Sequence, residues 1–234
     1  MIPEAIADTP ALEGIDLVKR FGSVVALHHA DLAVFAGEVL AIVGDNGSGK
    51  TTLIKCLSGA EVPDRGEVRI EGSVMRFRTA NDGRISGINT VYQSLAVQPA
   101  LDIASSLFRG HALTHPGHVD KGLRWLEAKG VKKPAAALAS KVIVLDEPTA
   151  ALGERESTQV LKLIDNLRGR GLPIIVATHN LKQVFKIADR IHVQREGKRA
   201  AVVSPHDFTI TDVLSMMSGS LQVDSTDQAT GPVR

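Results

Sequence analysis

Cysteine, aromatic side chains, unbalanced charge and long apolar runs are all scarce in this 234-residue sequence. A single cysteine, Cys56, excludes an internal disulfide. The 27 basic and 26 acidic residues leave a formal net charge of +1, which disfavours binding of nucleic acid through its phosphates. No apolar run approaches the roughly 18 residues that a transmembrane helix needs, so any function at a membrane requires a partner.

What the sequence does contain is aliphatic residues. Apolar residues make up 44% of the chain whereas aromatic residues make up 3%, so the core must be built from Val, Ile, Leu and Ala. Such a core suits parallel strands covered by helices. The first ten residues, MIPEAIADTP, have neither the basic start nor the apolar run of a secretion signal, and we expect a cytoplasmic protein.

Strand and helix patterns alternate along the chain. Residues 12–35 are typical of antiparallel strands, and 38–43 (EVLAIV) is typical of a strand buried on both faces. The remaining predicted elements are a helix over 51–57, a hairpin over 66–78, strands over 88–92, 141–145, 174–178 and 191–194, and helices over 154–168, 181–189 and parts of 101–130. This alternation predicts parallel β-α-β connections.

One domain accounts for this order of elements. The predicted fold is α/β, with a mostly parallel sheet flanked by helices and an N-terminal antiparallel β subdomain. We expect the domain to span residues 12–205 and to include a helical subdomain at about 100–138. Residues 219–234 are polar and aperiodic, which predicts a disordered tail.

A phosphate-binding loop (P-loop) stands between the predicted buried strand 38–43 and the predicted helix 51–57. It matches G-x-x-x-x-G-K-[ST] with Gly44, Asp45, Asn46, Gly47, Ser48, Gly49, Lys50 and Thr51. Glycines let backbone N–H groups approach phosphate oxygens, and the start of a helix adds positive partial charge. We expect Lys50 to reach the β- and γ-phosphates of ATP, Thr51 to offer its hydroxyl to Mg2+, and Thr52 to donate near the α-phosphate. The flanking strand and helix disfavour the alternative of a flexible Gly/Ser loop.

Two adjacent carboxylates follow the buried run VIVL at residues 142–145. Strand alternation points one of them toward Mg2+ and leaves the next beside the γ-phosphate. We expect Asp146 to hold the metal through its water shell and Glu147 to deprotonate the attacking water as a general base. A solvated acidic turn before Pro148 is the alternative, and the P-loop upstream makes it the weaker one.

Three segments together resemble the ABC ATPase family over roughly residues 12–200: GDNGSGKTTL, DEPTAALG after VIVL, and THN after IIVA. Within that family, TVYQSLAVQPALDI and VFKIADRIHV are similar to the ATPases of monosaccharide importers. The resemblance implies a Walker A and a Walker B motif and ATP hydrolysis, with Mg2+, that energises sugar import. It also implies a transmembrane permease subunit, a second ATP-binding subunit, a periplasmic sugar-binding protein, and a place on the inner face of the cell membrane.

The resemblance also assigns roles to three further residues. Gln93 corresponds to the Q-loop glutamine that contacts the metal and senses the membrane subunit, although it also suits a polar strand end. His179 corresponds to the switch histidine that hydrogen-bonds the γ-phosphate, with a solvated strand-end histidine as the alternative. Phe21 corresponds to the aromatic residue that stacks on adenine, with a core residue as the alternative.

The sequence departs from the family pattern in one segment. Family members carry LSGGQ at the start of a helix shortly before the Walker B strand, and nothing of that kind stands between Gln93 and Asp146. We infer a deletion there, which shortens the helical subdomain. Gly153 also stands where the family usually places Asp. In the family, the signature motif of one subunit closes over the ATP bound by the other subunit. A homodimer of this chain would therefore lack this contact at both of its nucleotide sites.

These departures leave other functions open. A nucleotide-binding subunit that hydrolyses ATP only opposite a complete partner, or never, is the first alternative. A decayed gene product is the second. A soluble ABC protein that acts on DNA or ribosomes is the third, and the chain shows neither the second cassette nor the long insertions usual in that class.

Overall fold

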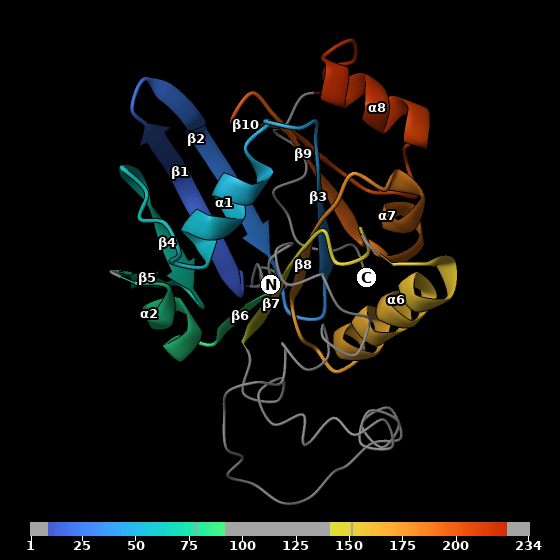
Figure 1. Cartoon of the computed structure of the whole chain (residues 1–234), viewed down its shortest axis with the longest axis horizontal. Helices are drawn as coiled ribbons and strands as arrows, with labels where there is room; N and C mark the ends of the chain where they lie inside the picture. The colour runs from blue at the N-terminus through green and yellow to red at the C-terminus, as the bar shows by residue number, and fades with distance from the viewer. Residues whose placement is uncertain (1–8, 78, 92–140, 151, 224–234) are drawn as a thin grey trace, which may run out of the picture.

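The computed structural model describes residues 9–77, 79–91, 141–150 and 152–223 (Figure 1). An antiparallel sheet contains β1 (Leu12–Phe21), β2 (Val24–Val34), β4 (Arg65–Ile70) and β5 (Ser73–Met75) in the order β2-β1-β4-β5. A second sheet contains β3 (Val39–Val43), β6 (Ile88–Val91), β7 (Val142–Asp146), β8 (Ile174–Ala177), β9 (Arg190–Arg195) and β10 (Lys198–Val203) in the order β10-β9-β3-β8-β7-β6. The helices are α1 (Lys50–Leu57), α2 (Ala80–Ile85), α6 (Glu154–Arg168), α7 (Leu181–Ile187) and α8 (Ile210–Ser218).

The second sheet is parallel except at one edge. Strands β9, β3, β8, β7 and β6 run in the same direction, and only β10 returns antiparallel to β9. All five residues of β3 and of β7 are buried, as expected for central strands covered on both faces. The predicted α/β fold with an N-terminal antiparallel subdomain is therefore confirmed.

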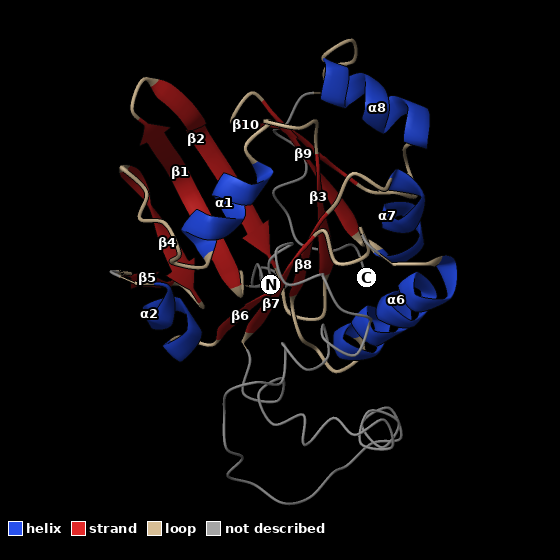
Figure 2. Cartoon of the chain, viewed as in Figure 1, coloured by secondary structure: helices blue, strands red, loops and turns tan. Residues whose placement is uncertain are grey.

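Helix α1 lies between the two sheets, whereas α6, α7 and α8 cover the other face of the parallel sheet (Figure 2). Alternation along β3 explains this division: Leu40 and Ile42 join the cluster around α1, whereas Ala41 and Val43 join the cluster around α7 and α8. Each fully buried Leu or Ile stabilises the fold by about 1.5–3 kcal/mol. The P-loop and α1 are thus held from two sides.

The structure adds elements that the sequence patterns did not give. Strand β10 and helix α8 both follow the last predicted strand, 191–194. Helix α8 packs its buried residues Val213, Met216 and Met217 on the parallel sheet. The predicted helices within 101–130, the helical subdomain and most of the predicted tail lie outside the described residues. In the part of the chain that the structure describes, no helix is long and apolar enough to span a membrane.

Candidate functional site

Three neighbouring strands end at one edge of the parallel sheet and carry the predicted site residues there. Strand β3 leads into the P-loop, β7 ends at Asp146, and β8 leads to His179. Since β8 lies between β3 and β7, with Ala177 paired to Ile42 on one side and to Asp146 on the other, the three strand ends are adjacent. The carboxyl ends of parallel strands are where α/β proteins place their ligands.

The P-loop backbone is tied to the antiparallel sheet and to the β9–β10 turn. Gly49 caps α1 at φ 100°, and a Cβ atom there would lie 2.7 Å from the Ala26 carbonyl oxygen. The Gly197 N–H donates to the Ser48 carbonyl oxygen over 3.0 Å, while the Gly197 carbonyl oxygen accepts from the His28 N–H over 2.8 Å. A side chain at position 49 therefore has neither the backbone conformation nor the space that it needs.

Lys50 lies folded over this loop. Its ammonium group donates to the carbonyl oxygens of Gly44 and Asp45 over 2.7 and 2.8 Å. Burial lowers the pKa of Lys50, whereas the nearby carboxylates of Glu147, Asp146 and Asp45 oppose that shift. Among the described residues, the Lys50 ammonium group therefore has only main-chain oxygens of the P-loop as hydrogen-bond acceptors.

The loop also contains a buried donor without a partner. The Ser48 side chain is 6% exposed, and its Oγ atom has no hydrogen-bond partner among the described residues. A buried hydroxyl without a partner costs about 1–3 kcal/mol, so such a group marks a place for a ligand. An acceptor-rich group such as a phosphate fits this donor.

Asp146 is buried and contacts the start of α1. Burial raises the pKa of Asp146, and the neighbouring charge of Glu147 adds to the rise, whereas a hydrogen bond from Thr51 lowers it. A buried carboxylate beside a threonine hydroxyl is an oxygen donor set that suits Mg2+. The structure thus brings together Thr51 and Asp146, two of the three residues that the sequence predicts for the metal.

Glu147 is held by the end of β8. Its Oε1 atom accepts from the backbone N–H of His179 over 3.1 Å and lies 2.7 Å from Nδ1 of the His179 ring. Its Oε2 atom accepts from the Thr178 hydroxyl over 3.2 Å. The backbone of Glu147 has a φ of 51°, a conformation rare outside glycine and often found at functional sites. No pattern in the sequence predicted the hydrogen bond between Thr178 and Glu147.

The remaining predicted residues fall into separate groups. Phe21 is 47% exposed at the end of β1, with the Lys19 ammonium 5.3 Å from its ring centroid, so the alternative of a core residue is wrong. The P-loop residues Asp45, Asn46 and Gly47 are exposed. Thr52 lies in the first turn of α1. Gln93 lies outside the described residues.

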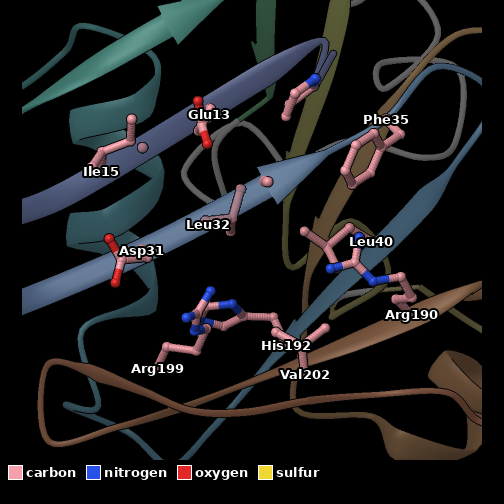
Figure 3. Close-up of a pocket in the computed structure, with 13 residues that line it drawn as sticks. Glu13, Ile15, Asp31, Leu32, Phe35, Leu40, Arg190, His192, Arg199 and Val202 are labelled. Atoms are coloured by element: carbon pink, nitrogen blue, oxygen red, sulfur yellow. The ribbon is translucent and has the colours of Figure 1, made fainter. Parts of the chain in front are cut away.

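A cavity of about 260 Å³ between β1, β2, β9 and β10 contains none of the predicted site residues (Figure 3). Among the residues that line it is His192, whose side chain is buried and whose Nε2 atom is 2.7 Å from Oε1 of Gln194. Neither Nδ1 of His192 nor Nε2 of Gln194 has a partner among the described residues. Burial lowers the pKa of His192 to about 4, and the ring is therefore neutral at physiological pH.

This buried histidine predicts a loss of stability in mild acid. The ordinary histidine pKa of 6.5 applies to the unfolded chain. Between pH 6.5 and about 4, His192 therefore binds a proton in the unfolded state but not in the folded state. The free energy of unfolding should fall by up to about 3 kcal/mol as the pH falls through that window. Urea denaturation at a series of pH values should show a smaller fall in His192→Gln, and equal falls in both proteins would contradict the prediction.

Several proteins with similar sequences are named as ATP-binding proteins of sugar import systems. The profile of the ABC transporter family matches residues 27–138. The fructose import ATP-binding protein FrcA of Rhizobium meliloti is 42% identical, with 92% of this chain and 96% of the relative covered. The xylose/arabinose import ATP-binding protein XylG of Sulfolobus acidocaldarius is 36% identical, with 88% and 93% covered. The ribose import ATP-binding protein RbsA 2 of Escherichia coli O157:H7 is 33% identical, and this chain covers 47% of its length.

Solved structures agree on the fold. A nucleotide-free ATP-binding cassette from an ABC transporter superposes with a TM-score of 0.68 at 22% identity, covering 88% of this chain and 95% of the other. An ATP-binding subunit of an ABC transporter gives a TM-score of 0.66 at 19% identity, covering 89% and 99%. These likenesses show that the arrangement of the two sheets and their helices is that of an ABC cassette.

The alignment with FrcA also contains positions that this chain does not fill. It extends over 250 positions, more than the 234 residues of the chain itself. The predicted deletion between Gln93 and Asp146 would leave such positions unfilled, and its place in the chain stays a prediction. With 42% identity over nearly the whole length of FrcA and the sheet edge described above, this chain belongs to the family of ABC transporter ATP-binding proteins.

Proposed function

We propose that this chain binds and hydrolyses ATP to energise the import of a monosaccharide. The observation that carries the proposal is the juxtaposition at one sheet edge of the Lys50 ammonium group on the P-loop with the buried carboxylates of Asp146 and Glu147. That set can hold a triphosphate, a divalent cation and an attacking water. The names of the fructose, ribose and xylose/arabinose import relatives suggest the sugar class.

Within this proposal the P-loop holds the phosphates. Its backbone N–H groups and the unpartnered Ser48 hydroxyl would donate to phosphate oxygens, and Lys50 would exchange its two carbonyl acceptors for the β- and γ-phosphates. The exposed ring of Phe21 would supply a stacking surface for adenine. Each of these groups is a donor or a surface that its present surroundings leave available to a nucleotide.

Thr51 and Asp146 would hold Mg2+, joined by Gln93. The hydrogen bond between Thr51 and Asp146 supports this assignment, because it places the exposed threonine hydroxyl beside the buried carboxylate, two oxygen ligands side by side. The metal would supply charge neutralisation for the phosphates. Burial, the largest cause of the raised pKa of Asp146, disfavours its charged form, and a bound cation would compensate that charge.

Glu147 would act as the general base. With both carboxylate oxygens engaged by Thr178 and His179, its orientation is fixed before a substrate arrives. His179 is well exposed, with 68% of its side chain accessible, so the ring is free to turn from Glu147 toward a γ-phosphate. A proton removed from the attacking water would pass to Glu147.

The proposed partners follow from the family and from the missing signature. A transmembrane permease would bring the chain to the inner face of the membrane, and a periplasmic binding protein would deliver the sugar. A second ATP-binding subunit would close the nucleotide site. Since no LSGGQ motif stands between Gln93 and Asp146, a second candidate function is a subunit that turns over ATP only opposite a chain that carries the motif.

One experiment tests both candidates. Binding of Mg-ATP is measured by calorimetry, and steady-state hydrolysis is measured with the purified chain alone and beside an intact homologue that carries LSGGQ. We expect saturable binding in both cases and at least a tenfold higher turnover per site beside the homologue, since the homologue closes the site. Robust turnover by the chain alone would contradict dependence on the signature, and absence of binding in folded protein would contradict the whole proposal.

A further inference from the structure

We propose that Thr178 is a positioning residue that sets the orientation of Glu147 for catalysis, an inference that rests on the proposed hydrolysis of ATP. Thr178 follows β8 directly and is 3% exposed. Its hydroxyl lies 3.2 Å from Oε2 of Glu147, the oxygen that His179 does not contact. Thr178 therefore holds one half of the carboxylate and His179 holds the other.

The direction of the hydrogen bond from Thr178 is fixed by its neighbour. The backbone N–H of Asn180 donates to the Thr178 Oγ atom over 3.1 Å, and a backbone N–H can only donate. The hydroxyl therefore accepts from Asn180, and its single hydrogen is left for the carboxylate of Glu147. A hydrogen bond to an ionised acceptor is roughly twice as strong as one between neutral groups.

Backbone hydrogen bonds of the parallel sheet hold Thr178 in place. Its N–H donates to the Ile42 carbonyl oxygen over 3.1 Å, and the Glu147 N–H donates to the Ala177 carbonyl oxygen over 2.8 Å. Donor and acceptor thus sit on adjoining strand ends that the parallel sheet keeps in register. Groups on such rigid elements position a reacting group more accurately than groups on loops do.

The same residue connects Glu147 to helix α7. Asn180, whose N–H contacts Thr178, is the N-cap of α7 and accepts from the Gln183 N–H over 3.3 Å through its side chain. The Thr149 hydroxyl donates to Oε1 of Gln183 over 2.6 Å, so the loop after Glu147 is joined to the same helix. A movement of α7 would therefore be transmitted to the carboxylate through Thr178.

If Thr178 had a purely structural role, substitutions at this position would have different effects on catalysis. If the residue only filled space, valine would serve as well, because it has the same branched shape without the hydroxyl. If the hydroxyl orients Glu147, valine should impair the chemical step and serine should restore it. Binding of ATP should be spared in both variants, because Thr178 has no contact with the P-loop in the hydrogen bonds of the described residues.

The test compares Thr178→Val and Thr178→Ser in the chain paired with the intact homologue. We expect kcat to fall about 10- to 100-fold in Thr178→Val, with KM and the Kd for Mg-ATP within about twofold of wild type, because a misplaced general base slows only the chemical step. Thr178→Ser should stay within about threefold of wild type. Equal kcat values for the valine variant and the wild type, or equal losses in both variants, would overturn the proposal.

A matched control is available in the same sheet. Thr90 of β6 carries a buried hydroxyl without a hydrogen-bond partner among the described residues, so Thr90→Val removes the same group without removing a hydrogen bond to Glu147. We expect its kcat to match wild type. A loss as large as that of Thr178→Val would show that any buried hydroxyl in this sheet matters, and would overturn the specific role of Thr178.

A spectroscopic measurement separates this inference from the proposed function. In the nucleotide-free protein, the 13C resonance of the Glu147 carboxyl carbon should move in Thr178→Val and stay in place in Thr178→Ser and Thr90→Val. If the paired protein binds Mg-ATP without turnover, hydrolysis is the part that fails, and the resonance alone decides whether Thr178 holds Glu147. An unmoved resonance in Thr178→Val overturns the inference.

Discussion

Lys50→Ala is expected to weaken the binding of Mg-ATP at least about 100-fold, which corresponds to about 2.8 kcal/mol. The ammonium group of Lys50 is half-buried and has only the carbonyl oxygens of Gly44 and Asp45 as acceptors in the P-loop. A triphosphate would offer stronger, charged acceptors at the same place. Calorimetric titration of the folded variant with Mg-ATP measures the loss.

Lys55→Ala provides a control for that experiment. Lys55 lies in the last turn of the same helix, and its charge also lowers the pKa of Asp146. The two variants therefore remove the same charge from α1, but only Lys50 lies on the P-loop. Binding of Mg-ATP within about threefold of wild type is expected for Lys55→Ala, and equal losses in the two variants would refute a direct contact between Lys50 and phosphate.

Much of the parallel sheet was predictable from sequence because its strands are continuously apolar. After Glu38, the runs VLAIV and VIVL contain no polar residue that could tolerate a solvated face. The P-loop follows the first run directly, and the carboxylate pair follows the second. The predicted helix over 154–168 agrees with α6. Local patterns were sufficient here because burial and periodicity gave the same answer.

The elements that were missed depend on local chemistry that hydrophobic patterns do not carry. Strand β10 pairs with β9 through a turn at Glu196 and Gly197, both with positive φ, and its KRAAVV sequence starts with two charges. Helix α8 begins with a capping box in which Thr209 and Asp212 bond each other's backbone N–H groups. Both signals were present in the sequence as short turn and cap motifs.

The candidate site, like the fold, was predictable only in part. Motif spacing located Lys50, Asp146 and Glu147, because their chemistry is tied to the strand ends that precede them. It could not show that Glu147 adopts a positive φ, or that Thr178 contacts it, because both depend on the pairing of β7 with β8. Residues separated by about thirty positions in the chain become partners only once that register is set.

Glu147→Gln is expected to preserve the binding of Mg-ATP and to reduce kcat at least about 100-fold. The amide keeps the size of the side chain and one oxygen that can accept from His179, but it cannot take a proton from water. Since the P-loop is untouched, the Kd for Mg-ATP should stay within about threefold of wild type. Single-turnover hydrolysis in the chain paired with the intact homologue measures the loss.

The matched control for this variant is Glu154→Gln, at the exposed start of α6. It makes the same chemical change outside the hydrogen bonds of Glu147, and its kcat should equal that of wild type. Turnover of Glu147→Gln at the wild-type rate would refute the role of general base, and would leave orientation of water by His179 and the metal as the source of catalysis. A joint loss of binding and turnover would instead mean that Glu147 supports the P-loop, because a base that acts only in the transition state leaves ground-state affinity unchanged.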